Sequence, residues 1–198
     1  MNSLPPPYVH QPELQVLNAA ASGDQDARRE LFERYREPAY RAAYRITGRA
    51  EDALDVVQDS FIAAFSKLDS FQRESSFRTW LLRIVTNRAL DLLRARRVRL
   101  AVSLDRDDDQ RPLVPARPAE SSAGARLERA ELAAQLRRAL EALPPDQRAV
   151  VALYAEGDMT YGQIAEVLGI PIGTVMSRLH HARLRLRAAL PDLATEDI

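Results

Sequence analysis

The sequence predicts an all-α protein: two small helical domains joined by a flexible linker, the second of which contains a helix-turn-helix. Apolar residues recur at spacings of three and four along most of the chain, which is the repeat of an amphipathic helix. Aromatic residues make up only 6% of the 198 residues and there are seven glycines, whereas a β-sandwich or barrel needs aromatic strands and Gly-rich turns. A stretch rich in Asp and Pro divides the helical pattern in two. We therefore expect domains at 13–98 and 127–192 and a linker at 99–126.

Turn and capping residues set the helices expected in the first domain. The turn Ser22-Gly23-Asp24 interrupts the first helical pattern, and Ser22 or Asp24 can cap the next helix through a side-chain oxygen. Gly48 ends that second helix, and the acidic pair Glu51-Asp52 favours the N-terminus of a third. The expected helices run from 13 to the turn at 22, from that turn to 48, from 51 to about 66, and from about 77 to 97, with an aperiodic loop at 68–76.

The predicted linker cannot bury enough apolar surface to offset the entropy of ordering it. Its aspartates resemble the composition of a calcium loop, but the D-x-D-x-D-G spacing and the acidic residue six positions later are missing. We therefore expect no metal there. These aspartates are Asp105, Asp107, Asp108 and Asp109.

The second domain ends in a helix-turn-helix pattern. A short helix at 160–168 is followed by a turn at 169–171 and a final helix at 173–190, which is the order of elements in this motif. Two further helices are expected before it, at 127–143 and from Pro145 to about 156.

The final helix has an apolar stripe and, on another side, a basic face. At about 100° per residue, the stripe consists of Val175, Leu179, Ala182 and Leu186, and the basic face consists of Thr174, Ser177, Arg178, His181 and Arg185. Four arginines and no acid lie between 172 and 190, although a merely solvated face normally mixes both signs. We expect this face to enter the DNA major groove, where base edges offer acceptors. Arg183 and Arg187 point to a third side and can reach phosphates.

A second basic element is the helix predicted at 77–97. Between 78 and 99 the chain carries seven arginines and one acid, and Arg83, Asn87, Arg94 and Arg97 share one helical face. Aromatic residues beside basic residues and a loop are typical of proteins that bind unstacked bases. Phe71, in the loop, is the preferred stacking candidate, whereas core and stacking positions are equally consistent for Phe77 and Trp80.

The helix predicted at 51–66 has an acidic outer face. Its expected packed stripe is Leu54, Val57, Phe61, Ile62 and Phe65, which leaves Asp55, Gln58 and Asp59 outside. An acidic face does not approach DNA. It suits a protein partner with a basic surface or is simply solvated, and composition does not choose between the two.

Two long stretches resemble a known family. The stretch EDALDVVQDSFIAAFSKLDSFQRESSFRTWLLRIVTNRALDLLRAR resembles conserved region two of bacterial extracytoplasmic-function (ECF) sigma factors, and ALEALPPDQRAVVALYAEGDMTYGQIAEVLGIPIGTVMSRLHHARLRLRAAL resembles their region four. The resemblance covers about residues 13–97 and 127–190. It implies a sigma factor that binds core RNA polymerase, recognises −35 and −10 promoter elements and helps to open DNA for transcription initiation.

The resemblance also implies roles for individual residues. Contacts to the −10 element fall on Phe71, Ser75, Arg78, Arg83, Asn87 and Arg94. Contacts to the −35 element fall on Arg148, which would lie near the DNA backbone, and on Thr174, Ser177, Arg178, His181 and Arg183. Docking on the polymerase clamp falls on Asp55, Gln58 and Asp59.

The implied partners are core RNA polymerase, through its clamp and flap, promoter DNA and an anti-sigma factor. The chain is expected in the cytoplasm, where an anti-sigma factor can hold it at the inner face of the membrane, and no membrane insertion of its own is expected. We expect no enzymatic activity, catalytic residue, metal, cofactor or small-molecule substrate. The chain has no cysteine, which excludes thiol chemistry.

The sequence departs from the family at two positions of the recognition helix. Family members often carry a basic residue at the position of Met176 and Arg at that of His181. Arg makes a bidentate contact to guanine that neutral His cannot make, worth about 1–3 kcal/mol. An altered or weaker −35 preference is therefore expected.

Two other functions compete with the sigma-factor interpretation. A stand-alone helix-turn-helix regulator explains the second domain but leaves the aromatic loop and acidic helix of the first unused. A recombinase or nuclease needs a nucleophile or clustered metal carboxylates in a folded domain; Ser75 and Ser76 have no nearby His, and the aspartate cluster lies in the linker.

Overall fold

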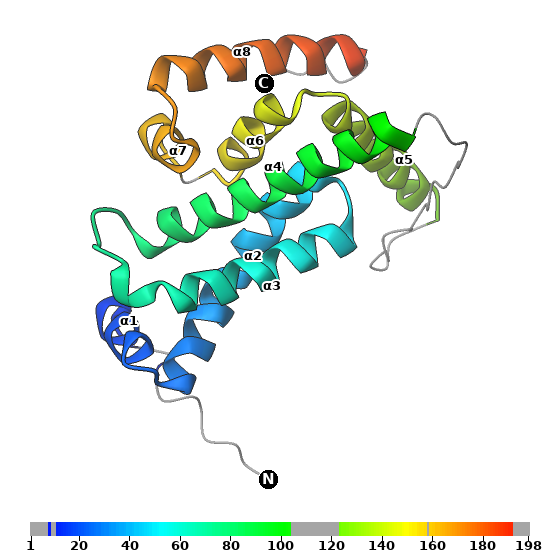
Figure 1. The fold of residues 1–198 in the computed structure, drawn as a ribbon. Coiled ribbons are helices and arrows are strands. Elements are labelled where there is room, and N and C mark those ends of the chain that lie inside the picture. The colour runs from blue at the N-terminus through cyan, green and yellow to red at the C-terminus, as the bar shows by residue number, and fades with distance from the viewer. Residues whose placement is uncertain (1–7, 9–10, 104–122, 158, 192–198) are drawn as a thin grey trace.

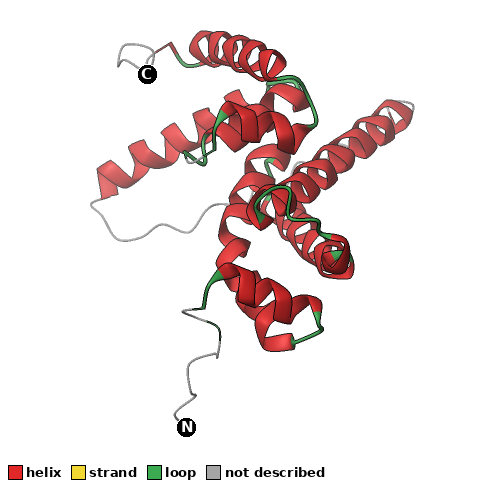
Figure 2. Cartoon of the chain, turned by 90° about the vertical axis from the view of Figure 1, so that its left-hand side faces the viewer, coloured by secondary structure: helices red, strands yellow, loops and turns green. Residues whose placement is uncertain are grey.

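The structure, a computed structural model, describes residues 8, 11–103, 123–157 and 159–191. Within these ranges the chain forms eight α-helices, one short 3₁₀ helix and no strand (Figures 1 and 2), which confirms the predicted fold class. The helices are α1 (Glu13–Ala21), α2 (Gln25–Thr47), α3 (Ala50–Ser66), η1 (Leu68–Ser70), α4 (Phe77–Ser103), α5 (Ala123–Glu141), α6 (Pro145–Tyr154), α7 (Tyr161–Leu168) and α8 (Ile172–Ala189). Helices α1 to α4 pack into a bundle, and α6 and α7 of the second group, α5 to α8, pack against α2 and α4 of that bundle.

Local signals fix the ends of α2. Asp24, one of the two predicted caps, accepts hydrogen bonds from the backbone N–H groups of Asp26 and Ala27 at 2.9 and 3.0 Å. Gly48 ends the helix in the left-handed region at φ 77°, where its N–H donates to Tyr44. Only glycine adopts this conformation without a steric penalty, so both predicted boundaries of α2 are confirmed.

Aromatic side chains fill one end of the first core. Phe77 is 1% exposed, and its ring lies 5.2 Å from that of Tyr35 and 5.8 Å from that of Trp80. Such tilted contacts add to the stabilisation that burial itself provides. Phe77 is therefore a core residue, while Trp80 is half-buried.

The predicted packed stripe of α3 is wrong at two positions. Leu54 and Ile62 are 59% and 60% exposed. The helix instead turns small and apolar residues towards α2 and α4. Small residues such as alanine and serine allow the helices to pack closely there. The buried residues are Ala53, Val56, Val57, Ser60, Phe61 and Ala64.

Helices enter both ends of the segment predicted as a linker. α4 continues to Ser103 and α5 begins at Ala123, so residues 99–103 and 123–126, expected as parts of the flexible linker, are helical. Asp105, Asp107, Asp108 and Asp109, where no metal was expected, lie with the rest of the linker outside the described residues.

The helix-turn-helix forms as predicted. Thr160 caps α7 through the backbone N–H of Gln163, and the Gln163 side chain accepts from the N–H of Thr160 in return, which is a capping box. Gly169 ends α7 at φ 63°. Val175 and Leu179 of α8 are buried together with α7, so the turn holds the two helices at a fixed crossing.

The two helical groups share their apolar cores. Leu82 of α4 and Ala42 of α2 are buried in the second core, beside Val150 and Leu153 of α6. Ala149 of α6 is in turn buried in the first core. In this structure the second domain therefore packs against the first through fully buried side chains.

Candidate nucleic-acid interface

The basic face of α8 points away from the core. Val175, Leu179 and Ala182 are buried, while Ser177 and His181 are exposed and Thr174 is half-buried. The predicted division of this helix into a packed stripe and an open face is thus present. Leu186, predicted in the stripe, is only half-buried because it lies near the end of the helix.

His181 is held in one tautomer by its own helix. Its Nδ1 lies 2.8 Å from the backbone oxygen of Ser177. A carbonyl oxygen only accepts, so Nδ1 carries the proton and donates, and the Nε2 of the neutral ring remains an acceptor. The residue therefore presents a hydrogen-bond acceptor, whereas an Arg at this position would present only donors.

Arg178 is paired across the helix-turn-helix domain. Its Nη2 lies 3.1 Å from the carboxylate of Asp146, in the first turn of α6. The arginine side chain is 28% exposed. This ion pair orients the guanidinium along the outer side of α8. Helical periodicity alone does not reveal that Asp146 is the partner. Arg183 is exposed and stacks over Tyr154, with its guanidinium carbon 5.4 Å from the ring centre.

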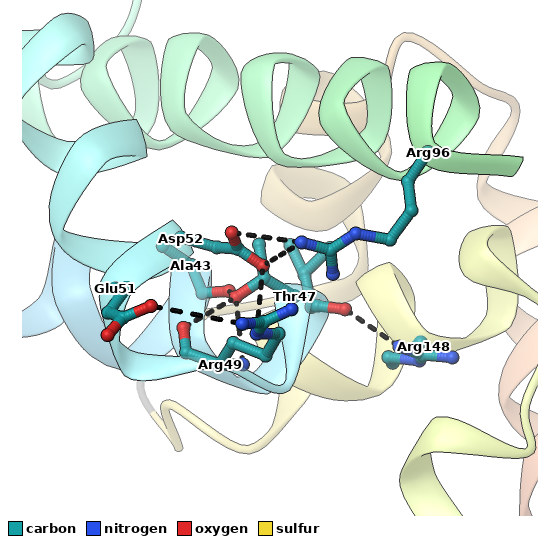
Figure 3. Close-up of polar contacts among 8 residues, drawn as sticks. Ala43, Thr47, Arg49, Glu51, Asp52, Arg96 and Arg148 are labelled. Carbon is teal, nitrogen blue, oxygen red and sulfur yellow. Dashed lines mark hydrogen bonds and ion pairs between the residues drawn. The ribbon is translucent and has the colours of Figure 1, made fainter. Parts of the chain in front are cut away.

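Arg148 occupies a different place from the one predicted. It is 8% exposed and donates to the backbone oxygens of Ile46, Leu143 and Glu141, so Figure 3 shows it reaching from α6 towards the end of α2. Burial lowers the pKa of its guanidinium. Because both terminal nitrogens of its guanidinium donate to backbone oxygens inside the protein, Arg148 is a structural residue here and does not face a DNA backbone.

The predicted −10 face of α4 is only partly open. Asn87 and Arg94 are exposed, and Arg94 pairs with Asp91 on its own helix at 2.7 Å. Arg83 instead turns towards the second domain, where its Nη2 donates to the backbone oxygen of Glu166 at 2.7 Å. Helical periodicity places Arg83 on this face of α4, but it gives no sign of the partner that the residue finds there.

Arg78 also faces the second domain. Its guanidinium lies 3.8 Å from the carboxylate of Glu156, and that carboxylate is fully buried. Arg41 and Arg45 of α2 pair with the same group, and the hydrogen bond from Arg41 to Glu156 raises the pKa of Arg41. Glu156 carries no local signal in the sequence, because its partners lie far away along the chain.

Residues 72–74 of the loop before α4 are exposed, but the Phe71 ring packs against its neighbours. Phe71 is half-buried, and its ring lies 4.9 Å from that of Trp80 and 6.1 Å from that of Phe77. Arg73, at φ 59°, hydrogen-bonds to Asn18 of α1. The predicted stacking residue is thus occupied by its own neighbours in this structure, and Ser75 beside it is half-buried.

Ser76 fixes the start of α4. Its hydroxyl accepts from the backbone N–H of Thr79 at 3.1 Å, which satisfies one of the free N–H groups of the first turn. The direction in which the basic helix leaves the loop is therefore set locally.

The acidic face of α3 is open and borders a shallow hollow. Asp55, Gln58 and Asp59 are exposed, as predicted. Asp59 lies 3.3 Å from Arg88 of α4, and a hollow of about 210 Å³ lies between the two helices at this point. Leu54 and Ile62 are exposed on the same helix, so the surface combines acids with apolar side chains.

An ion pair made by one nitrogen of Arg96 connects α4 to the beginning of α3. Arg96 donates to both carboxylate oxygens of Asp52 at 2.8 and 3.1 Å, and Arg49 lies beside them, as Figure 3 shows. Both hydrogen bonds start at Nη2, so the carboxylate of Asp52 shares one guanidinium nitrogen. They hold the outer end of α4 in line with the acidic face of α3.

Among the described residues, no cluster of three or more His, Cys, Asp or Glu has the arrangement of a metal site. Within the same part of the chain, no helix is both long and apolar enough to cross a bilayer.

Comparison with known proteins identifies the family. The model of sigma-70 region 2 matches residues 31–99, and that of sigma-70 region 4 matches residues 133–186. The chain is 37% identical over 180 residues to the ECF RNA polymerase sigma factor SigE of Mycolicibacterium smegmatis, covering 89% of this chain and 67% of that protein. It is 33% identical to the ECF RNA polymerase sigma factor SigW of Bacillus subtilis, covering 89% of this chain and 96% of that protein. The chain belongs to the ECF family of sigma factors.

Solved structures agree with this assignment. CnrH, in complex with the cytosolic domain of CnrY, superimposes with a TM-score of 0.64 at 31% identity, covering 91% of this chain and 97% of that one. The sigma factor RpoE of Bartonella quintana, in complex with the anti-sigma factor NepR, superimposes with a TM-score of 0.58 at 25% identity. The match covers 90% of this chain and 93% of that one. This ECF sigma factor therefore functions with RNA polymerase in promoter recognition.

Proposed function

We propose that this sigma factor divides promoter recognition between two helices: α4 with its preceding loop binds the −10 element as separated strands, and α8 binds the −35 element as duplex. The observation that carries the proposal is the acid-free outer face of α8, exposed behind a fully buried stripe of Val175, Leu179 and Ala182. The neutral net charge of the chain makes this local segregation of arginines more informative than bulk charge.

For the −35 element we propose contacts from four residues in the major groove and one to the DNA backbone. Arg178 and His181 read base edges, one as a donor and the other as an acceptor, while the exposed Arg183 reaches a phosphate. Thr174 and Ser177 complete the face. Arg148 is left out because its two terminal nitrogens already donate to three carbonyl oxygens.

For the −10 element we propose that Asn87 and Arg94 bind the strands directly and that Arg78 and Arg83 do so once released from the second domain. Ser75 and Phe71 would border a flipped base, which requires the Phe71 ring to leave Trp80. Extruding a base costs a few kcal/mol, and these contacts offset that cost.

The proposed docking site for core polymerase is the outer face of α3. Asp55, Gln58 and Asp59 supply charge to the clamp, and the exposed Leu54 and Ile62 supply apolar contact. A mixture of apolar and charged residues is typical of interfaces whose charges steer association. The second domain would contact the flap.

We propose an anti-sigma factor as a further partner. RpoE of Bartonella quintana was solved with NepR, which is named as an anti-sigma factor, and CnrH was solved with the cytosolic domain of CnrY. The sigma factor itself would act in the cytoplasm, or at the inner face of the membrane when such a partner holds it there. It would act without a catalytic step of its own.

In-vitro transcription on fragmented genomic DNA tests this function on every promoter of the genome at once. Core polymerase plus this chain is expected to start RNA at new positions that share a two-part motif upstream. A stand-alone helix-turn-helix regulator instead binds duplex DNA without polymerase and starts no RNA. Absence of chain-dependent start sites would contradict the proposal.

A further inference from the structure

One carboxylate at the seam between the domains holds three arginines of the first domain. The Glu156 side chain, just after α6, is 0% exposed. It pairs with Arg41 at 2.9 Å, with Arg45, and with Arg78 at 3.8 Å. A buried carboxylate is stable only when such partners compensate its lost hydration, so these contacts depend on the two domains being together.

A second contact covers the neighbouring turn of α4. Both Nη2 and Nε of Arg83 donate to the backbone oxygen of Glu166, at 2.7 and 3.2 Å, and the Glu166 carboxylate is 3.7 Å away. Leu82, which lies between Arg78 and Arg83 in the sequence, is 1% exposed and packs against α6. Acceptor oxygens of the second domain therefore occupy the donors that phosphates and bases would use.

We propose that α6 and α7 of this chain and promoter DNA are mutually exclusive occupants of the α4 face, with Glu156 as the latch that keeps the free protein closed. The proposal rests on the −10 role of Arg78 and Arg83 given above. A protein whose binding-competent state is only fractionally populated loses apparent affinity by that fraction. Anything that separates the domains raises the populated fraction of the open state. The apparent affinity for DNA rises by the same factor as that fraction.

Two substitutions open the latch from opposite sides. Glu156→Gln removes the charge while keeping the shape of the side chain, and Arg41→Ala removes a partner on α2 that belongs to no proposed DNA contact. Glu131→Gln, on the exposed side of α5, is the matched control for the loss of one negative charge. Thermal unfolding of each variant checks that the fold survives.

Two readouts on the full chain separate opening from DNA binding. Because the chain has no cysteine, Ser66→Cys and His180→Cys allow two dyes to report the distance between α3 and α8 by energy transfer. Fluorescence anisotropy with a short, labelled single-stranded DNA of mixed sequence reports affinity. Both latch variants are expected to lengthen the dye distance and to tighten DNA binding about tenfold, and Glu131→Gln is expected to do neither.

Each remaining outcome counts against the latch. If the unchanged protein already shows the longer distance, the closed state is not populated. If the variants lengthen the distance but bind DNA no better, the α4 face is not blocked by the second domain. A chain that initiates transcription with core polymerase and shows either result retains its proposed function and loses only the latch.

Discussion

The Nη2 atom of Arg83 lies 2.7 Å from the backbone oxygen of Glu166, so the arginine at the centre of the predicted −10 face is held by the helix that precedes the recognition helix. One contact thereby links α4 to the helix-turn-helix of this sigma factor. A change at either end of it is expected to be felt in both halves of the molecule.

Arg83→Ala is expected to reduce promoter opening by about tenfold or more, since a good base contact is worth about 1–3 kcal/mol. Permanganate reactivity of thymines in complexes with core polymerase measures it. Arg99→Ala is the control, because Arg99 lies on the opposite side of the same helix and bonds only to its own backbone at Ala95 among the contacts described. Equal reactivity of the two variants would remove Arg83 from the −10 site.

Arg148→Met is expected to lower the free energy of unfolding by about 3 kcal/mol, because it leaves carbonyl oxygens without their charged donor. Three such oxygens accept from Arg148. Urea denaturation measures the change. Unchanged stability together with weaker −35 binding would instead restore the backbone contact predicted from the sequence.

His181→Arg is expected to change the base preferred at one position of the −35 element. The native ring offers an acceptor at Nε2 because Nδ1 donates to Ser177, whereas Arg offers a bidentate donor to guanine worth about 1–3 kcal/mol. Selection of promoters from a randomised −35 library measures the shift. His180→Arg adds the same charge about 100° around the helix and is expected to leave the preference unchanged.

Asp55→Lys is expected to weaken association with core polymerase severalfold, with a larger effect at low salt because exposed charges are screened. Titration of labelled polymerase measures the affinity. Glu33→Lys makes the same charge change on α2, at a residue whose side chain is 51% exposed and which belongs to no proposed docking contact. If both variants bind polymerase equally well, the α3 face is not the docking site.

Asp24→Asn is expected to flatten the loss of stability in acid. Hydrogen bonds from the backbone N–H of Ala27 and from the Tyr8 hydroxyl lower the pKa of Asp24 below its ordinary 3.8. A lowered folded-state pKa contributes stability above the unfolded value, which is lost as the pH falls through the folded one. Urea denaturation from neutral pH to below 3.8 compares the two proteins, which should differ in slope only in the acidic range, since Asn also caps helices.

Short-range signals were sufficient for most of the fold. The turn at Gly48, the cap at Asp24 and the Gly169 turn of the helix-turn-helix each act over a few residues, so the sequence specifies them directly. The face of α8 followed from periodicity for the same reason. The predicted stripe of α3 was wrong because the prediction assumed that apolar side chains are buried, whereas Leu54 and Ile62 are exposed.

The candidate site was less predictable because its decisive contacts are distant in sequence. Arg148 was predicted near the DNA backbone, but in the structure it donates to the carbonyl oxygen of Ile46, which is distant in the sequence. The arginine partners of Glu156 come from α2 and α4, so nothing near it in the sequence marks it out. Phe71 was placed correctly before α4, but the loop alone does not show that its ring rests on Trp80.

The shared packing of Leu82 and Ala42 with α6 also bears on dissection of the molecule. Truncating the chain after its amino-terminal half would strip the cover from two side chains that water never reaches in the intact protein. Such a fragment would be prone to aggregate. Low solubility of the fragment would then reflect the loss of α6 as a packing partner rather than misfolding.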